Sequence, residues 1–492
     1  MIPVALGDLV ALLGVPLTAG DPAALVTSVV ADSRAVGPGA LFVALVGARV
    51  DGHDHVPGSL GQGAVAALTS RDVPGAPCLV VEDPLAALGR IARLVVDLGA
   101  GQGGSAGLQV VGITGSQGKT STKDLLAQVL EAAGPTVAPV GNLNNELGVP
   151  LTACRVAPET RFLVAELGAR GIGHIAYLCQ VVAPRVGVVL NVGQAHVGEF
   201  GGQDAIARAK GELVEALPAE GWAVLNADDP RVWAMRSRTP ADVLAFSIRG
   251  APDGPGLWAG DSTADRLGRH RFRLHARTAG GAEERAEVAL RLTGRHQVAN
   301  AVAAAAAATA VGLELGVIAD RLSRAGARSR WRMELVERAD GVVVINDAYN
   351  ANPDSMRAAV STLAELGRSS GGRTWAVVGD MLELGDTASA EHADLGRYLV
   401  EQHVSRIVAV GEHAAGMVDA ALAAGADPAS VLATTDKQQA LAAVRARLAP
   451  GDVVLVKASR GLTLDTVAEA LTVSAGSGEP RDQPTARSED PA

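Results

Sequence analysis

The chain of 492 residues is too long for a single hydrophobic core, and its length predicts about three domains. Hydrophobic residues make up 48% of the chain but aromatic residues only 3%, so the cores are expected to consist mainly of Ala, Val and Leu. A formal net charge of −10 argues against a broad nucleic-acid surface, and an anionic ligand would therefore need locally placed Arg, Lys or helix N-termini.

The first segment, residues 1–107, is expected to form a domain of its own. Its Gly-rich end, at 101–107, has the composition of a flexible linker. Asp8 and the lack of a basic residue before the first apolar stretch make the N-terminus a poor signal peptide. The three cysteines of the chain have no metal-type spacing, which is typical of reduced thiols. These features predict a cytoplasmic protein.

A strand, a glycine turn and a helix are predicted in succession from Val110 to Ala133. An apolar, β-branched run leads into Gly115-Ser116-Gln117-Gly118-Lys119-Thr120, and a helix-compatible segment follows at 123–133. Phosphate would be bound by the backbone N–H groups of such a turn, by the helix N-terminus and by the Lys119 ammonium. The Thr120 hydroxyl is suited to ligate a phosphate-bound Mg²⁺. Ile113 stands where a Walker A sequence has its first glycine, so an ordinary Gly-rich turn is the alternative. The Lys-Thr pair favours ATP binding.

Two further buried strands of the parallel type are predicted at 162–165 and 186–190. Glu166 follows the first strand, and Asn191 and His196 follow the second. Because ligands collect at the carboxyl ends of parallel strands, we expect Glu166 and His196 near the phosphates, as Mg²⁺ ligands or beside them. Taken singly, His196 could be an ordinary hydrogen-bonded loop residue, and Glu166 a solvated strand end.

The rest of the central domain, which is expected to span residues 108–327, is less regular. A Gly-, Pro- and Asp-rich patch at 250–260 precedes an antiparallel extension with strands near 271–275 and 288–292. The alanine-rich run at 301–319 is expected to be a buried, closely packed helix and not a membrane span, because two glycines and a glutamate interrupt it.

A third α/β unit is predicted for residues 328–473. Its strands are expected at 341–345, 375–379, 406–410 and 453–456. The remainder, 474–492, is rich in Gly, Pro, Ser and charged residues and is expected to be disordered. The fold class predicted from this order of elements is α/β, with three domains.

Several motifs together resemble the Mur ligase family. They are Thr114–Thr122, Gly141-Asn-Leu-Asn-Asn145, Glu166-Leu-Gly-Ala169, Asn191–His196 and Gly294-Arg-His-Gln-Val-Ala-Asn300. Asp347-Ala-Tyr-Asn-Ala-Asn-Pro353 and Val378–Leu384 resemble one member, which joins D-alanyl-D-alanine to UDP-N-acetylmuramoyl-tripeptide. The resemblance covers about residues 20–473. It implies an ATP-dependent amide ligase of cytoplasmic peptidoglycan synthesis, expected to be a monomer without a nucleic-acid partner or an integral membrane segment.

The resemblance also implies how the sites are divided among the domains. It implies an N-terminal UDP-binding α/β domain, a central P-loop-type ATPase domain with a mainly parallel sheet, and a C-terminal Rossmann-like α/β domain. The implied ATP contacts are Thr114, Gly115, Ser116, Gln117, Gly118, Lys119, Thr120, His296, Asn300, Asp347, Tyr349 and Asn350. The implied UDP-substrate contacts are Ser33, Arg34, Asn142, Asn144 and Asn145. For the three asparagines, the residues alone favour a turn-rich loop.

The sequence departs from the family pattern at two places in the third domain. Ser329-Arg330-Trp331-Arg332 occupies the position where many members have Pro-Gly-Arg, and Ala458 stands where the family often has glycine.

Lys210 lies on the apolar face of a predicted helix, one turn after Ile206. A lysine there must either extend its ammonium to water or serve a purpose, and spacing alone favours the first. The resemblance of Ala209-Lys210-Gly211-Glu212 to the family implies a lysine carbamylated by CO₂. By the same resemblance, Thr120, Glu166, His196 and carbamylated Lys210 would hold Mg²⁺, and Lys119, Lys210 and His196 would be catalytic.

Two alternatives remain open at this point. Another amide ligase of the same family could add an amino acid earlier in the stem peptide, or glutamate to a folate. A protein of a different class could bind nucleotide as a switch without ligase activity. ADP release that depends on a UDP-linked peptide would separate the two classes.

Overall fold

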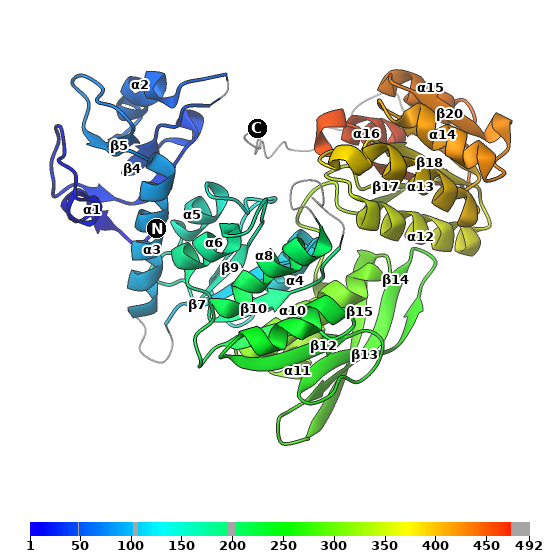
Figure 1. The fold of residues 1–492 in the computed structure, drawn as a ribbon, viewed down its shortest axis with the longest axis horizontal. Coiled ribbons are helices and arrows are strands. Elements are labelled where there is room, and N and C mark those ends of the chain that lie inside the picture. Colours follow the sequence, from blue (N-terminus) through cyan, green and yellow to red (C-terminus); the bar gives the residue numbers. More distant parts are fainter. Residues whose placement is uncertain (48, 102–106, 194–201, 474–492) are drawn as a thin grey trace.

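The computed structural model describes residues 1–47, 49–101, 107–193 and 202–473. The segment 102–106, the predicted site residue His196 and the predicted disordered tail lie outside the described residues. The predicted α/β class is confirmed, because three larger sheets, each flanked by helices, follow one another along the chain (Figure 1). Within the described ranges, no helix is long and apolar enough to cross a membrane.

The first sheet is small and parallel, with the order β3-β4-β5-β6. Its strands are β3 (Ser28–Val30), β4 (Ala40–Val43), β5 (Ala64–Thr69) and β6 (Cys78–Val80). A short antiparallel pair, β1 (Val4–Ala5) and β2 (Leu25–Val26), lies beside α1 (Leu6–Leu13). The remaining helices are α2 (Val56–Gly61) and α3 (Pro84–Gly101). The carboxylate of Asp83 accepts from the N–H groups of Leu85 and Ala86, which satisfies the N-terminal turn of α3.

The second sheet has nine strands in the order β15-β14-β13-β12-β11-β10-β7-β9-β8. It is parallel from β8 to β13 and antiparallel from β13 to β15, as the predicted mainly parallel sheet with an antiparallel extension requires. The strands are β7 (Gln109–Thr114), β8 (Thr136–Val137), β9 (Phe162–Glu166), β10 (Val186–Val189), β11 (Trp222–Asn226), β12 (Asp242–Ser247), β13 (Gly256–Ala264), β14 (Arg269–Arg277) and β15 (Glu283–Thr293).

Helices cover both faces of this second sheet (Figure 1). They are α4 (Lys119–Leu130), α5 (Gly148–Ala153), α6 (His174–Val182), α8 (Gln203–Glu215), α9 (Pro230–Ala234), α10 (His296–Ala310) and α11 (Leu315–Arg324). The central residues of β7, β9 and β10 are buried on both faces, which explains why the middle of each strand is apolar.

The third sheet has the order β16-β17-β21-β18-β19-β20, and only β16 is antiparallel to its neighbour. Its strands are β16 (Glu334–Glu337), β17 (Val343–Asn346), β18 (Thr374–Gly379), β19 (Arg406–Val410), β20 (Val431–Thr434) and β21 (Val453–Lys457). Its helices are α12 (Pro353–Ser370), α13 (Ala388–Glu401), α14 (Ala414–Ala423), α15 (Lys437–Arg445) and α16 (Asp465–Thr472). A reciprocal pair of hydrogen bonds between Asn352 and Ser355 caps α12.

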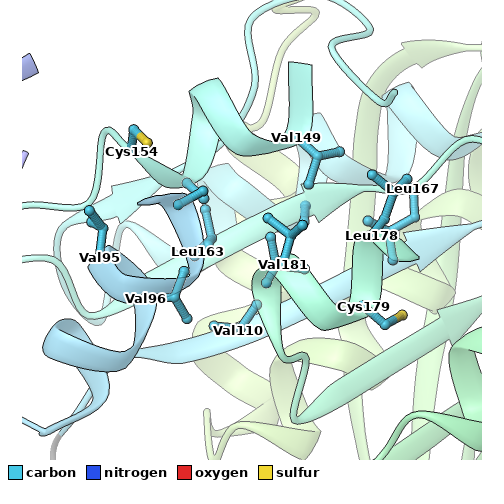
Figure 2. Packing of buried hydrophobic residues seen from close by; sticks show 14 of the residues in the cluster. Val95, Val96, Val110, Val149, Cys154, Leu163, Leu167, Leu178, Cys179 and Val181 are labelled. Carbon is cyan, nitrogen blue, oxygen red and sulfur yellow. The ribbon is translucent and has the colours of Figure 1, made fainter. Parts of the chain in front are cut away.

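The first two sheets share one hydrophobic core, which α3 joins. Val95 and Val96 of α3 pack among Val110, Leu163 and Val181, all of which belong to the second sheet and its helices (Figure 2). The third sheet has clusters of its own, and Leu267, in the turn between β13 and β14, is the residue of the second sheet's region that joins one of them. The first two domains are therefore packed as one body, whereas the third is attached by a smaller contact.

Two predicted helices differ from the structure. The alanine-rich run at 301–319 is not one helix, because α10 ends at Ala310 and α11 begins at Leu315. Gly312, with a φ of +90°, takes the left-handed conformation between them. The predicted helix at 123–133 begins earlier, at Lys119, and ends at Leu130, so that the lysine and threonine of the phosphate loop form its first turn.

Candidate active site

A cavity of about 570 Å³ lies between the second and third domains. The carboxyl ends of two parallel sheets meet there. Gly115 follows β7, Glu166 ends β9, Asp347 follows β17 and Lys457 ends β21, and all four residues line the cavity. This is the place where α/β sheets bind ligands, and here two such edges face each other.

The phosphate loop has the conformation that its glycines allow. Gly118 has a φ of +82°, and a Cβ there would lie 2.5 Å from the Asn300 Oδ1 atom. Asn191, just past β10, accepts from the N–H of Gln117 at 3.0 Å and donates to its carbonyl at 3.1 Å. These contacts hold the backbone of the loop in place and leave its remaining N–H groups at the N-terminus of α4, where an anion is stabilised.

Two lysine side chains lie at this loop. The Lys119 ammonium donates to the Gly115 carbonyl at 2.7 Å, and burial lowers the pKa of Lys119. The side chain of Lys210, on α8, is buried and lines the same cavity. Burial, together with the charge of Lys119, lowers the pKa of Lys210 well below its usual value. The sequence interpretation that Lys210 simply extends to water is therefore wrong.

Glu166 lies opposite the loop with one oxygen held and the other unpaired. Its Oε1 accepts from the Asn144 side-chain amide at 2.8 Å, whereas its Oε2 is buried without a hydrogen-bond partner. An unpartnered buried carboxylate oxygen is costly unless a cation or donor completes it. The structure thus gives Glu166 a position suited to a metal ion beside the phosphates.

The third domain contributes an ion pair to the cavity, formed by Lys457 and Asp347. Lys457 donates to the Asp347 Oδ2 at 2.6 Å and to the Asn350 carbonyl at 2.9 Å. The other oxygen of Asp347 accepts from the N–H of Met333. The predicted residues Asp347 and Asn350 therefore lie at the cavity, with Lys457 bracing them.

Arg332 is the most important cavity residue that the sequence analysis did not assign. Its Nη2 donates to the Thr120 hydroxyl at 3.2 Å, and its guanidinium lies 4.2 Å from the ring centre of Tyr349. Its Nε is buried without a partner. The departure at Ser329–Arg332 from the family pattern was a signal pointing to this segment, but spacing alone could not show that the second arginine faces the phosphate loop.

His296 and Asn300 lie on the first turns of α10 and line the same cavity. Burial lowers the pKa of His296 to about 4, so its imidazole is neutral near pH 7. Asn300 accepts from the Thr122 hydroxyl at 3.3 Å and donates to Gln297 at 3.0 Å, which places its side chain against the back of the phosphate loop.

The predicted site residues fall into two groups. Those that line the cavity are Gly115, Ser116, Gln117, Gly118, Lys119, Thr120, Asn142, Asn144, Asn145, Glu166, Lys210, His296, Asn300, Asp347 and Asn350. Four of the others do not line it. Thr114 donates its hydroxyl to the Leu167 carbonyl, Tyr349 lies under Arg332, and Ser33 and Arg34 lie in the first domain. His196 lies outside the described residues.

In the first domain, Arg34 pairs with the neighbouring Asp32. The Arg34 Nη2 lies 2.8 Å from the Asp32 Oδ2, and hydrogen bonds from Arg34 lower the pKa of that carboxyl. The side chain of Arg34 is 63% exposed. Ser33, which is half-buried, precedes it in the same short helical turn, apart in the fold from the phosphate loop (Figure 1).

Comparison with known proteins agrees with this architecture. Models of the Mur ligase family match in three parts: the family's catalytic domain at residues 25–94, the middle domain at 113–308 and the glutamate ligase domain at 331–460. The UDP-N-acetylmuramoyl-tripeptide–D-alanyl-D-alanine ligase of Mycobacterium tuberculosis is 46% identical over 92% of this chain and 93% of its own. The enzyme of the same name from Escherichia coli is 34% identical over 96% and 99%.

Solved structures agree with the same assignment. The crystal structure of MurF from Acinetobacter baumannii aligns with a TM-score of 0.83 at 32% identity, covering 96% of this chain and 99% of that one. MurF ligase from Thermotoga maritima, solved in complex with ADP, aligns with a TM-score of 0.75 at 27% identity, covering 90% and 97%. With three domain models, whole-length relatives and a shared arrangement of sheets in agreement, this chain belongs to the Mur ligase family.

Proposed function

We propose that the chain joins D-alanyl-D-alanine to UDP-N-acetylmuramoyl-tripeptide, using ATP and releasing ADP and phosphate. Its whole-length relatives carry the name of this ligase, and the chain spans nearly all of their length. The observation that carries the proposal is the cavity itself. A phosphate loop from the second domain faces Arg332, Asn350 and Lys457 of the third domain across it.

The reaction that this cavity supports proceeds in two steps. A terminal carboxylate oxygen of the tripeptide attacks the γ-phosphorus of ATP, forming an acyl phosphate while the bond to ADP breaks. The amine of D-alanyl-D-alanine then attacks the acyl carbon, phosphate leaves, and the nitrogen loses a proton. Lys119, Arg332 and the loop N–H groups neutralise the charge on the transferred phosphoryl group. The chain's main contribution is therefore positioning and charge neutralisation.

Residues at the cavity also fit a magnesium ion. Glu166, with its unpartnered Oε2, and the Thr120 hydroxyl would hold it, and bound Mg²⁺ supplies charge neutralisation at the phosphate oxygens. Among the described residues, no group of three His, Cys, Asp or Glu side chains could hold a metal by itself. This fits an ion that takes most of its ligands from phosphate and water. His196 stays a predicted ligand.

Lys210 fits the proposed carbamate. Carbamylation joins the neutral amine to CO₂, forming an N–C bond and releasing one proton, and it turns an ammonium into a carboxylate-like group. Burial favours the neutral amine that this step needs. Within the described part of the chain, no hydrogen bond or ion pair engages the Lys210 ammonium, and its side chain is directed into a cavity that contains Glu166.

The UDP end of the substrate is assigned to Ser33, Arg34 and the asparagines of the loop at 142–145. The first two can donate to uracil or diphosphate, and the asparagines can bind phosphate or sugar without added charge. We also propose that the enzyme works as a monomer in the cytoplasm, where its nucleotide-linked substrates would be made.

ADP release measured with a coupled assay tests the proposal. The reaction is run with ATP, Mg²⁺ and UDP-N-acetylmuramoyl-tripeptide, and with D-alanyl-D-alanine, single amino acids or no amine as acceptor. Release that needs both the tripeptide and the dipeptide supports the proposal. Release with a single amino acid would assign the chain to another step of the pathway, and release without any peptide would make it a plain ATPase.

A further inference from the structure

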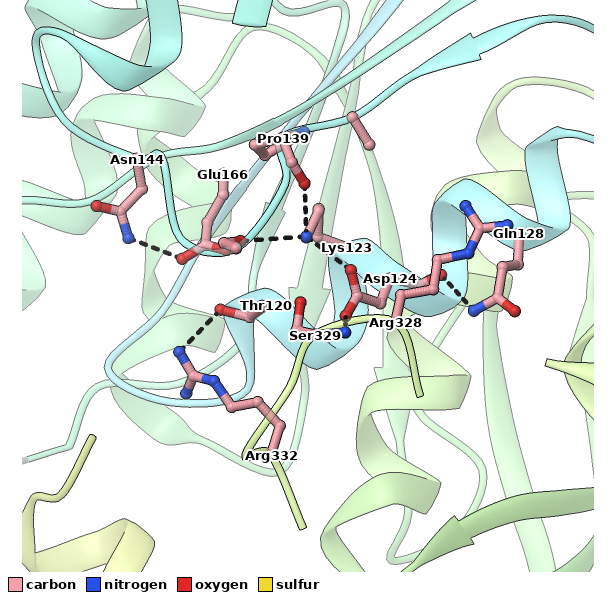
Figure 3. A network of polar contacts seen from close by, with 12 residues as sticks. Thr120, Lys123, Asp124, Gln128, Pro139, Asn144, Glu166, Arg328, Ser329 and Arg332 are labelled. Atoms are coloured by element: carbon pink, nitrogen blue, oxygen red, sulfur yellow. Dashed lines mark hydrogen bonds and ion pairs between the residues drawn. The ribbon is translucent and has the colours of Figure 1, made fainter. Parts of the chain in front are cut away.

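Two neighbouring residues on α4, Lys123 and Asp124, form a buried ion pair behind the phosphate loop (Figure 3). The Lys123 Nζ lies 2.6 Å from the Asp124 Oδ1, and the two side chains are 2% and 12% exposed. Removing two charges from water costs free energy that their attraction often fails to return. The stability of the fold alone therefore gives no reason for a charged pair here, where two apolar side chains could pack.

The contacts of Lys123 indicate what the pair does. Besides Asp124, its ammonium donates to the carbonyls of Pro139 at 2.8 Å and Gly141 at 3.2 Å, so all three of its protons are used. Both carbonyls belong to the segment that enters the loop at 142–145. Gly141 has a φ of +65°, so the chain turns sharply at this point. Lys123 thus fixes the start of that loop without lining the cavity itself.

The far side of the same loop is fixed to the active site. The Asn144 side chain donates to the Glu166 Oε1 at 2.8 Å, and the Asn144 carbonyl accepts from the N–H of Gly168 at the same distance. Asn145 accepts from the N–H of Gly148 at 2.8 Å, at the start of α5. The placement of Asn144 against Glu166 therefore depends on both ends of the loop, and Lys123 holds one of them.

Asp124 connects this arrangement to the third domain. Its Oδ2 accepts from the backbone N–H of Ser329 at 3.0 Å (Figure 3). Ser329 is buried and lies three residues before Arg332, whose guanidinium reaches Thr120. One turn of α4 thus holds the start of the asparagine loop on one side and the connection to the third domain on the other.

We propose that Lys123, oriented by Asp124, is a positioning residue for the ligation reaction. It sets the loop at 142–145 so that Asn144 meets Glu166 and the loop can receive the UDP-linked substrate. This inference rests on the proposed function and extends it to a residue that touches neither substrate nor nucleotide.

The test replaces Lys123 with methionine, which keeps the length of the side chain and removes its charge and donors. We expect the KM for UDP-N-acetylmuramoyl-tripeptide to rise about tenfold or more, because the carbonyls of Pro139 and Gly141 lose their donor and the loop shifts. The KM for ATP is expected to change by less than about threefold, because the phosphate loop keeps its own contacts with Asn191. Calorimetric titration of the UDP-tripeptide without ATP should show the same weakening.

Gln128→Met is the matched control. Gln128 lies on the same helix and makes two hydrogen bonds to Gly326, at 2.9 and 3.1 Å, and donates to the backbone carbonyl of Asp124 at 2.9 Å, but it makes none to the segment at 139–145. The Gln128→Met substitution removes about as many partly buried hydrogen bonds as Lys123→Met does. It should leave the KM for the UDP-tripeptide within about twofold of the wild-type value. An equal rise in both variants would mean that any damage to α4 has this effect, and would overturn the assignment to Lys123.

A double-mutant cycle with Asn144→Ala checks the route of the effect. If Lys123 acts through Asn144, the Asn144→Ala substitution should weaken UDP-tripeptide binding less in the Lys123→Met background than in wild type. Additive losses, or an unchanged KM in Lys123→Met, would overturn the proposal.

If Lys123→Met does not fold, Asp124→Asn serves instead: a selective rise in the KM for the UDP-tripeptide supports the proposal, and an unchanged KM contradicts it. A wild-type enzyme without tripeptide-dependent ADP release would instead refute the proposed function, whatever Lys123 does.

Discussion

The Nη2 atom of Arg332 lies 3.2 Å from the hydroxyl oxygen of Thr120, so the third domain contacts the phosphate-loop helix through a charged side chain. The same hydroxyl is the predicted Mg²⁺ ligand of the loop. Because a metal ion on this oxygen would repel the guanidinium beside it, and the ATP phosphates attract that guanidinium, we expect Arg332 to leave Thr120 when Mg·ATP binds and to turn toward the phosphates.

We therefore predict that Arg332→Met raises the KM for ATP by about thirtyfold, which corresponds to about 2 kcal/mol of lost charge-assisted hydrogen bonding. Arg332→Lys should recover part of this loss. The control is Arg330→Met, because Arg330 lies in the same segment but pairs with Glu469 at the surface. Steady-state kinetics that give the same KM for all three variants would contradict the role of Arg332.

Lys119→Ala should reduce kcat by about a hundredfold or more, because one preorganised cation is lost where phosphoryl charge develops. The protein should stay folded, since among the described residues the Lys119 ammonium donates only to the loop's own Gly115 carbonyl. Rapid-quench measurement of ADP formation, with circular dichroism as the check on folding, tests this. Near-normal turnover would remove Lys119 from the reaction.

Glu166→Gln should raise the Mg²⁺ concentration needed for half-maximal rate several-fold or more, while the KM for the UDP substrate changes little. The amide can still accept from Asn144 but cannot offer a charged oxygen to the metal. Titration of the rate with Mg²⁺ at fixed ATP measures the effect. An unaltered Mg²⁺ response would mean that the unpaired Oε2 serves another partner.

For Lys210→Ala we predict severe loss of activity that acetate restores in part. A small carboxylate can occupy the space that the carbamate would fill, whereas chloride at equal ionic strength should not help. Carbon-13 NMR of the wild-type protein under labelled bicarbonate offers an independent check, with a carbamate resonance expected and absent from the variant. Full activity of Lys210→Ala would refute the role outright.

An ATP analogue and the UDP-tripeptide together should compact the protein. The third domain has its own core and contacts the second through Leu267, the Arg266–Glu337 ion pair and the segment along α4, so it can move as a unit without opening that core. Closure would also exclude water from an acyl phosphate. Small-angle scattering should show a smaller radius of gyration with both ligands than with either alone, and an unchanged radius would argue against closure.

The sequence predicted those parts of the site that depend on neighbouring residues along the chain. The strand, turn and helix around Lys119 and the carboxylate ending β9 follow from residue type and spacing, and the structure brings Glu166 beside the loop, as parallel strands require. Several strands were missed. In the third sheet these are β16 and β20, which lie at sheet edges and are only partly buried, so that their apolar pattern is weak. In the second sheet they are β8, β11, β12 and β13, and β13 begins inside the Gly-, Pro- and Asp-rich patch at 250–260 that was expected to interrupt the pattern.

Residues that act through tertiary contacts could not be found this way. Arg332 reaches the Thr120 hydroxyl from another domain, whereas Lys457 and Lys123 contact oxygen atoms of other segments within their own domains. An arginine or lysine most often lies in solvent, so residue type alone does not predict any of these contacts. The prediction of a single helix at 301–319 was wrong for a simpler reason. Gly312, in a left-handed conformation, divides this mainly apolar stretch into two helices.

The shared core around α3 has a consequence for substrate choice. Because Val95 and Val96 are buried among residues of the second sheet, a movement of the first domain relative to the phosphate loop would have to break this shared core. With the uridine end held at Ser33 and Arg34, as proposed, the shared core keeps that end of the substrate at a fixed distance from the phosphate loop. A stem peptide one residue too short would leave its carboxylate away from the γ-phosphate, so the enzyme would measure the length of its substrate as well as its chemistry.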